Sequence, residues 1–171
     1  MCYYCLIRRT ELSKLKVSDI NLKTNTIFIH SENSKNKQSA HVTMPTELKK
    51  LLKKHISGAK KTNYLFSANN YAPGSTNFHP DKCSKKWRKM RLYLKLDENI
   101  KWYSLKDTGI TDLIIAGVDL VSVRDQARHH SIKQTNTYIP QNLKTANDKI
   151  INSGVKFKKK YKKVSNSWFL V

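Results

Sequence analysis

Two short β-rich runs lie close together in a chain whose remaining apolar periodicity is helical. Residues 26–30 (Thr-Ile-Phe-Ile-His) and 40–44 (Ala-His-Val-Thr-Met) are separated by a polar loop, residues 31–39, that is rich in Lys, Asn and Ser. Runs of β-branched and aromatic residues joined by such a loop predict an antiparallel hairpin. Residues 64–66 (Tyr-Leu-Phe) could add a third short strand. The residues therefore predict an antiparallel hairpin, to which this third strand could be added.

Helical patterns account for most of the other segments. Pro45-Thr46 begins a helix with one basic and one apolar face. The apolar face consists of Leu48, Leu51, Leu52 and Ile56. Residues 81–96 then form a strongly basic helix that contains Trp87. Together with the short strands, these helices predict an α+β fold that is mainly α.

The second half of the chain carries clear signals for helix ends. Ser104-Leu105-Lys106-Asp107 has the S-x-x-D pattern of a capping box, which would open a helix that runs to Ala116. Gly117 suits the left-handed position after a helix, and Asp119 can cap the next helix, which runs to about Arg128. Residues 141–152 are expected to form a last helix, followed by a basic tail.

Charge indicates the kind of partner. The chain of 171 residues has 33 Lys and Arg against 12 Asp and Glu, a net charge of +21. An excess of cations spread over a whole domain favours nucleic acid as the partner. A basic protein of the membrane surface is the alternative, but it would need an amphipathic helix with aromatic anchors, which the sequence lacks. No apolar run is long enough to cross a membrane.

The cysteines fit a reducing cytosol rather than a disulfide framework. There are three, an odd number: Cys2, Cys5 and Cys83. Cys2 and Cys5 form a C-x-x-C pair, but no second pair is present to close a zinc site. We interpret both as residues that face the core, and we expect no metal and no cofactor.

A histidine followed nine residues later by a tyrosine, His129 and Tyr138, is the pattern that most directly suggests chemistry. A tyrosine hydroxyl has an ordinary pKa of about 10 and needs nearby cations before it can attack a phosphate. Arg8 precedes Glu11 by three residues, so the carboxylate could hold the arginine in place, although a surface ion pair is the alternative. Lys106, in the first turn of its helix, could bind an anion or could simply be exposed.

These segments, in this order, resemble the catalytic domain of the tyrosine recombinase (phage integrase) family. The resemblance rests on Arg8-Arg9-Thr10-Glu11-Leu12, the loop with Lys35, Tyr103 to Thr108, and His129 to Tyr138. It covers about residues 3–150 and is greatest for integrases of mobile elements and prophages. It implies a helical catalytic domain with a small three-stranded antiparallel sheet, and a function in site-specific DNA recombination and integration.

The resemblance also assigns roles to residues. It places Tyr138 as the nucleophile, His129 as a hydrogen-bond donor to the phosphate, Arg8 as the first arginine and Lys35 as the hairpin lysine. Arg9 and Lys37 are the alternatives if either register slips by a short step. The family's central H-x-x-R pattern becomes Tyr103-Ser104-Leu105-Lys106 here. Lysine keeps the charge of arginine but loses its planar fork, and tyrosine is a poorer proton acceptor than histidine.

A second departure precedes the histidine. The family usually has glycine where this chain has Arg128, so we consider that Arg128 or Arg124 supplies the guanidinium that Lys106 lacks. His130 is a further possible DNA contact, as are Arg9, Lys37 and Arg128. Two rival interpretations stay within DNA binding: a catalytically silent relative, and an enzyme that relaxes supercoils as type IB topoisomerases do. A generic basic protein, for example a ribosomal one, is a third.

The resemblance finally implies domains and partners. Residues 1–152 would be a catalytic domain whose upstream DNA-clamping domain is missing, and residues 153–171 a basic tail. The partner would be double-stranded DNA, bound by a homo-tetramer, whereas the isolated domain would be a monomer. The expected place is a bacterial-type cytosol, at the nucleoid, without a membrane.

Overall fold

The computed structural model describes residues 1–139, 152, 161–164 and 167–170. The chain divides into two units, residues 1–139 and 140–171. In the second unit, strands β4 (Tyr161–Val164) and β5 (Ser167–Leu170) form an antiparallel hairpin within the segment expected to be a basic tail. The predicted helix over residues 141–152 falls almost entirely outside the described residues.

The first unit contains the predicted three-stranded antiparallel sheet, in the order β1-β2-β3. Its strands are β1 (Ile20–Asn21), β2 (Thr26–Ile29) and β3 (Ala40–Thr43). Pairing of Ile27 with both Ile20 and Val42 places these side chains on one buried face. The hairpin is confirmed, but the third strand is residues 20–21. Residues 64–66 are not a strand, since Tyr64 only bridges Lys16 and Gly74.

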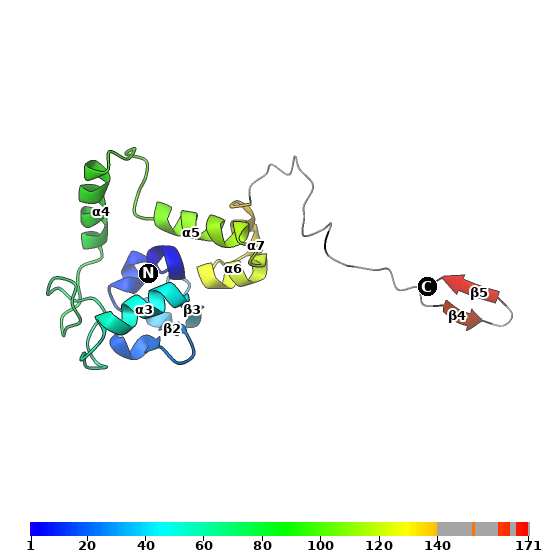
Figure 1. Ribbon diagram of the computed structural model, residues 1–171, viewed down its shortest axis with the longest axis horizontal. Helices are drawn as coiled ribbons and strands as arrows, with labels where there is room; N and C mark the ends of the chain where they lie inside the picture. The colour runs from blue at the N-terminus through cyan, green and yellow to red at the C-terminus, as the bar shows by residue number, and fades with distance from the viewer. Residues whose placement is uncertain (140–151, 153–160, 165–166, 171) are drawn as a thin grey trace. The chain divides into compact units, whose positions relative to one another are not determined.

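Helices make up most of the rest of this unit (Figure 1). Two short ones, α1 (Cys2–Cys5) and α2 (Arg9–Leu12), open the chain, and the 3₁₀ turns η1 (Val17–Asp19) and η2 (Ser31–Asn33) flank the first two strands. They are followed by α3 (Thr46–His55), α4 (Asp81–Tyr93), α5 (Ser104–Ile115), α6 (Leu120–Ala127) and α7 (Ile132–Asn136).

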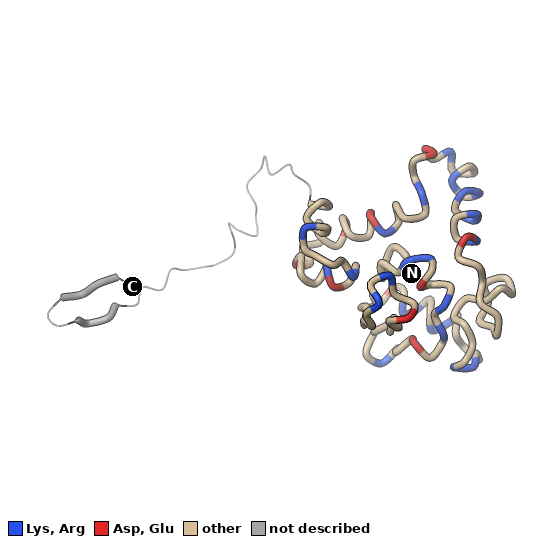
Figure 2. The backbone as a smooth tube through the Cα atoms, turned by 180° about the vertical axis from the view of Figure 1, so that it is seen from behind, with Lys and Arg blue, Asp and Glu red and all other residues tan. Residues whose placement is uncertain are grey.

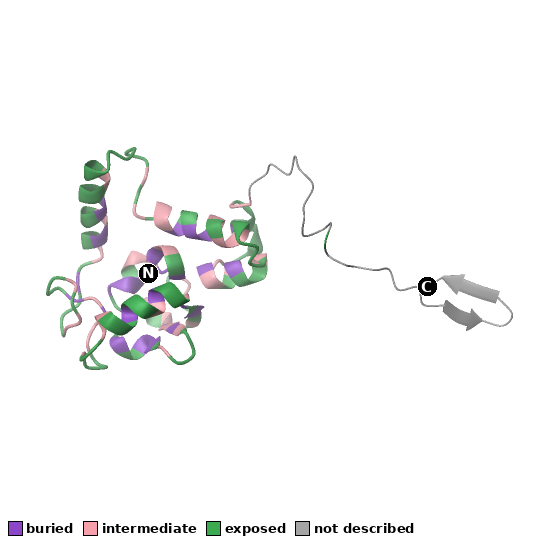
Figure 3. Cartoon of the chain, viewed as in Figure 1, coloured by how far each residue is buried: buried purple, intermediate pink, exposed green. Residues whose placement is uncertain are grey.

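Apolar side chains form two clusters in this unit. The larger one joins the sheet to α3 through residues that include Ile27, Val42, Leu48 and Leu52. Leu51, expected on the same face, is instead 62% exposed. Cys2 and Cys5 are both buried, as predicted. Figure 3 shows that buried and exposed positions alternate along the helices.

The smaller cluster fixes the part of the fold that holds the candidate site. Leu6, Ile110, Val123 and Ala127 are buried together, and Tyr138 packs against them. Helix α1 can approach α5 closely because Gly109 has no side chain. A Cβ there would lie 2.3 Å from the backbone oxygen of Tyr3. The cluster therefore brings the start of the chain beside the segment that ends in Tyr138.

The predicted helix ends are confirmed in part. Gly117 has a φ of 82°, and the Asp119 side chain accepts a hydrogen bond from the Ser122 backbone N–H. The capping box at Ser104 is wrong, because Tyr103 occupies the N-cap position and the Ser104 hydroxyl accepts from the Lys101 backbone instead. The carboxylate of Asp107 is therefore free of a capping role.

Candidate active site

Five of the predicted site residues line one pocket. Arg8, Tyr103, Lys106, His129 and Tyr138 surround a cavity of about 390 Å³, together with Gln134 and Thr137. They come from the start of α2, the start of α5, and the segment from the end of α6 through α7. Residues separated by up to 130 positions therefore meet at one place.

Glu11 anchors the arginines beside this pocket. The Glu11 side chain is only 1% exposed, and its Oε1 lies 2.9 Å from Nη1 of Arg8. The Arg8 side chain is 14% exposed. The Arg8 backbone N–H also donates to Glu11, at 2.8 Å. The ion pair thus has a buried carboxylate and a largely covered guanidinium, and the alternative of a surface pair does not hold.

Arg128 shares the same carboxylate. Its guanidinium donates to Glu11 Oε2 at 2.6 Å and to the backbone oxygen of Leu6 at 3.2 Å. Arg124 pairs with Asp125 at 2.7 Å. Both arginines are therefore engaged with carboxylates of the chain itself. Neither lines the pocket of Tyr138, which does not favour the idea that one of them replaces the missing guanidinium there.

Lys106 lies deep in the site. It is 6% exposed, and its Nζ donates to the backbone oxygen of Ala127 at 2.8 Å. Burial, followed by the positive charges of Arg8 and Arg128, lowers the pKa of Lys106 to about 7. Arg8 and Arg128 share the buried carboxylate of Glu11, and Lys106 adds a third cation that no carboxylate of the described residues contacts. This leaves an excess of positive charge suited to a phosphate.

His129 is held as a neutral side chain. Burial, followed by the charges of Lys106, Arg8 and Arg128, lowers its pKa to about 4. Its Nδ1 lies 3.0 Å from the hydroxyl of buried Thr135. If that hydroxyl donates to Nδ1, the proton is on Nε2, where it can be donated to an anion. His129 therefore suits hydrogen bonding to a phosphate better than charge neutralisation.

Tyr138 is fixed by two contacts. Its ring stacks on that of His129 with centroids 6.1 Å apart, and its hydroxyl donates to Oδ1 of Asp107 at 2.8 Å. Partial burial and the bond to Asp107 raise the pKa of Tyr138 to about 12. Sequence reasoning missed Asp107 as a partner because it assigned that carboxylate to a helix cap.

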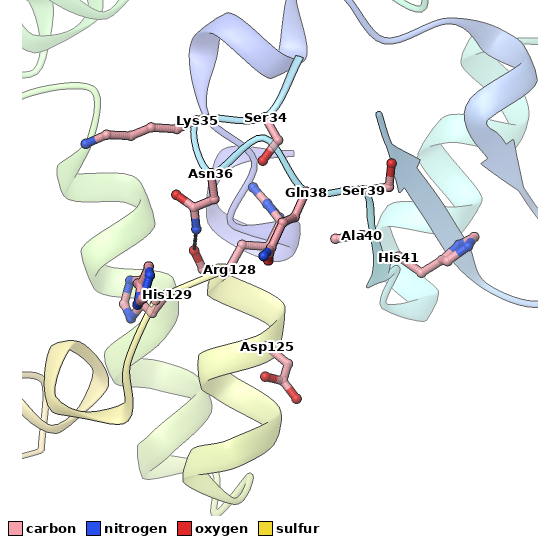
Figure 4. A pocket seen from close by; sticks show the side chains of 11 residues that line it. Ser34, Lys35, Asn36, Gln38, Ser39, Ala40, His41, Asp125, Arg128 and His129 are labelled. Atoms are coloured by element: carbon pink, nitrogen blue, oxygen red, sulfur yellow. Dashed lines mark hydrogen bonds between the residues drawn. The ribbon is translucent and has the colours of Figure 1, made fainter. Parts of the chain in front are cut away.

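Lys35 lies in a neighbouring pocket rather than in that of Tyr138. This second cavity has about 630 Å³ and is also lined by Asn36, Arg128, His129 and His130. Asn36 donates to the backbone oxygen of Arg128 at 2.9 Å, the bond that the dashed line marks in Figure 4. The two pockets share His129, so the loop with Lys35 adjoins the tyrosine site without entering it.

The remaining candidates lie elsewhere. Arg9 pairs with Asp81 and also donates to Ser84, which ties α2 to the start of α4. Lys37 is exposed, with a left-handed φ of 51°, and lines neither pocket. Figure 2 shows further Lys and Arg residues along α4, a basic surface outside both pockets.

The described residues include neither a cluster suited to a metal ion nor a membrane-spanning helix. In the part of the chain that the structure describes, no group of three or more His, Cys, Asp or Glu is placed to hold a metal ion. None of the described helices is long and apolar enough to span a bilayer.

Comparison with known proteins gives a consistent result. The profile of the phage integrase family matches residues 1–144. A tyrosine recombinase of Pseudothermotoga lettingae is 25% identical over 141 residues, covering 81% of this chain and 46% of that protein. Tyrosine recombinase XerA of Saccharolobus solfataricus is 29% identical over 133 residues, 77% of this chain and 40% of the relative. The chain thus spans about half the length of these relatives.

Solved structures share the fold. A crystal structure of XerA recombinase superposes with a TM-score of 0.67 at 20% identity, covering 91% of this chain and 56% of that one. The integrase of transposon Tn1549, in complex with circular intermediate DNA, gives a TM-score of 0.68 at 16% identity, covering 84% and 54%. These likenesses confirm the mainly helical fold with its small antiparallel sheet.

Proposed function

Because the chain belongs to the phage integrase family, we propose that it breaks and rejoins DNA strands in site-specific recombination, with Tyr138 as the nucleophile. One observation carries the proposal: the hydroxyl-bearing ring of Tyr138 lines the same cavity as Arg8, Lys106 and His129. A nucleophile beside an excess of buried positive charge suits attack on a phosphodiester. The related structures include a DNA complex, which supports double-stranded DNA as the substrate.

The chemistry proceeds in two transesterifications. Tyr138 Oη attacks the phosphorus, forming a 3′-phosphotyrosyl bond while the bond to the 5′-oxygen breaks. Lys35 gives a proton to that leaving oxygen, and the 5′-hydroxyl of a partner strand later reverses the reaction. The covalent bond conserves the energy of the phosphodiester, so no energy source is needed. Cationic side chains of the protein neutralise the developing charge, so the proposed mechanism uses no metal or cofactor.

Each pocket residue has a separate part in this mechanism. Arg8 is held through Nη1 by Glu11 and through Nη2 by the backbone oxygen of Arg128, and its remaining N–H donors would bind the phosphate in the pocket that it lines. Lys106, when protonated, has three N–H donors, one of which is bonded to Ala127, so two remain for the phosphate. His129 donates from Nε2. Tyr103, which is exposed at the mouth of the pocket, orients groups or relays a proton.

A catalytically silent DNA-binding relative is the second candidate. The observation in its favour is the state of Tyr138, whose hydroxyl is bonded to a carboxylate and whose pKa is raised to about 12. Replacement of the family's arginine and histidine by Lys106 and Tyr103 points the same way. Both candidates bind DNA, and only strand cleavage separates them.

We extend the proposal to the assembly in which the chain acts. A homo-tetramer on two DNA duplexes would exchange the strands, and the isolated chain would be a monomer that binds DNA weakly and with a steep dependence on salt. Residues 1–152 would be the catalytic domain and 153–171 a basic tail, with DNA clamped by a further upstream domain. The place of action would be the nucleoid of a bacterial-type cytosol.

The test is a search for covalent protein–DNA adducts. The chain is incubated with supercoiled plasmid at low salt, and the reaction is quenched with detergent, with Tyr138→Phe as the matched variant that lacks only the hydroxyl. An adduct formed by the wild type and absent from the variant is the expected result. An adduct that survives in the variant would contradict the assignment of the nucleophile. No adduct from either chain would favour the silent relative.

A further inference from the structure

The hydroxyl proton of Tyr138 already points at a carboxylate. Tyr138 Oη donates to Asp107 Oδ1 at 2.8 Å, across 31 residues of sequence. Asp107 lies in the first turn of α5, directly after Lys106, and its backbone N–H bonds to the Tyr103 carbonyl. A helix N-terminus favours negative charge, and the carboxylate at this position accepts the hydrogen bond from Tyr138.

The other polar groups of the pocket are engaged differently. Lys106 Nζ donates to Ala127, and His129 Nδ1 pairs with Thr135. Arg8 is bonded to Glu11 and has only donors to offer. Asp107 does not line the cavity, but it accepts the hydrogen bond of the Tyr138 hydroxyl and is therefore placed to receive the proton that Tyr138 must lose.

We propose that Asp107 is a catalytic residue, the general base that accepts the Tyr138 proton during attack on DNA. This inference rests on the proposed function. As Tyr138 Oη bonds to phosphorus and the bond to the 5′-oxygen breaks, the tyrosine proton moves to Asp107 Oδ1, and the leaving oxygen receives a different proton from Lys35. Asp107 ends as a neutral acid and returns its proton to solvent or, in the reverse step, to Tyr138.

The ionisation state of Tyr138 explains why a base is needed. With a pKa of about 12, only about one hydroxyl in 10⁵ would be ionised at pH 7. The ionisable groups that face it are Arg8 from the start of α2 and Lys106 from α5, which line the same pocket, and Asp107, which accepts its hydrogen bond. The imidazole of His129 beside it is neutral. The cations stabilise the phosphate, while the adjacent carboxylate removes the proton as the new bond forms.

The same helix carries a matched control. Tyr3 donates its hydroxyl to Asp112 Oδ2 at 2.6 Å, so α5 holds two tyrosine–aspartate pairs. Asp112 lines neither the Tyr138 pocket nor that of Lys35. A change of Asp112 to Asn therefore alters an equivalent hydrogen bond without touching the proposed chemistry.

The experiment compares the initial rates of covalent adduct formation by wild type, Asp107→Asn and Asp112→Asn on supercoiled plasmid, at several pH values between 6 and 9. Asparagine keeps the shape of aspartate but cannot take a proton. We expect Asp107→Asn to be about 10²-fold slower at pH 7. We expect Asp112→Asn to match the wild type. DNA affinity, measured by fluorescence anisotropy, should be unchanged or higher in Asp107→Asn because a negative charge is lost beside the DNA.

The loss of rate in Asp107→Asn should depend on pH if Asp107 is a base, but not if its contact with Tyr138 is merely structural. Without its base, Tyr138 must react from the ionised fraction, which grows about tenfold per pH unit. The ratio of the wild-type rate to the Asp107→Asn rate should therefore shrink as the pH rises. Other groups titrate in both proteins, so their effect cancels in this ratio. A ratio that does not change with pH would overturn the proposal.

Two other outcomes are informative. An Asp107→Asn chain that forms adduct faster than the wild type would show that Asp107 restrains the tyrosine rather than deprotonates it, and would overturn this inference while leaving the proposed function intact. If the wild type forms no adduct, the proposed function fails first, and Asp107 has no reaction to assist.

Discussion

The guanidinium of Arg128 donates a hydrogen bond of 2.6 Å to Oε2 of Glu11, although the backbone of Arg128 is left-handed, with a φ of 53° and a ψ of 49°. Glycine adopts this conformation without steric cost, whereas other residues lose about 1 kcal/mol or more. The chain thus accepts strain at the end of α6 and gains a buried ion pair that also holds Arg8 through the shared carboxylate.

Paired substitutions at Arg128 separate these two effects. Both Arg128→Ala and Arg128→Gly remove the ion pair, and each should lower the free energy of unfolding by roughly 3 kcal/mol because Glu11 loses a buried partner. Glycine relieves the backbone strain, so Arg128→Gly should be about 1 kcal/mol more stable than Arg128→Ala. Urea unfolding followed by tryptophan fluorescence measures the difference.

Arg124 provides the control for that comparison. It lies inside α6 with ordinary helical geometry and pairs with the exposed Asp125. There the order should reverse, with Arg124→Ala about 1 kcal/mol more stable than Arg124→Gly. Equal stability of the two Arg128 variants would contradict the left-handed conformation at the end of the helix.

Substitution of Lys106 by arginine should change how DNA binding depends on pH. The pKa of Lys106 is lowered to about 7, so the free chain loses this charge as the pH rises above 7, and phosphate binding must then restore the proton. Affinity for DNA should fall by up to about tenfold per pH unit between 7 and 9. Arginine stays charged over this range, so Lys106→Arg should bind with a flatter profile.

Anisotropy titrations of a labelled duplex at fixed ionic strength test this prediction. His129, with a pKa of about 4, stays neutral throughout. The terminal amine of Met1, whose pKa is lowered by burial, titrates equally in both chains. Parallel losses of affinity in wild type and Lys106→Arg would show that Lys106 is not the group responsible.

Much of the fold followed from local patterns. The hairpin, α3, α4 and the cap at Asp119 each depend on residues within a few positions of one another, and periodicity and turn chemistry report such contacts directly. The third strand was misplaced because Ile20–Asn21 has only two residues, too few to show alternation. Tyr64 to Phe66 has the composition of a strand but makes only isolated bridges.

The candidate site was predicted only in part, because many of its contacts join positions that are far apart in the sequence. The ordered segments predicted Arg8, Lys106, His129 and Tyr138, which the structure brings to one pocket. Contacts between distant positions were not predictable: Asp107 with Tyr138, and Arg128 with Glu11, which are 117 residues apart. A carboxylate near a helix start suggests a cap, and only packing shows that it faces a tyrosine instead.

The contribution of Lys35 to catalysis should depend on the next residue, Asn36, which anchors the loop that carries both. Asn36 bonds to the backbone oxygen of Arg128, which directly precedes His129, so this amide sets where the loop lies against the site. If Lys35 protonates the leaving oxygen, Lys35→Ala should slow adduct formation by about 10²-fold or more. Asn36→Ala keeps the lysine but loosens its placement, and should cost about tenfold.

Lys37→Ala is the matched control, because Lys37 belongs to the same loop, is exposed and lines neither pocket. Its adduct rate should stay close to that of the wild type, measured on the same plasmid. A large loss in Lys37→Ala with little change in Lys35→Ala would move the proton donor two residues along the loop. If Asn36→Ala alone had no effect, Lys35 would reach the DNA without the anchor to Arg128, and the position of the loop would be set by the DNA itself.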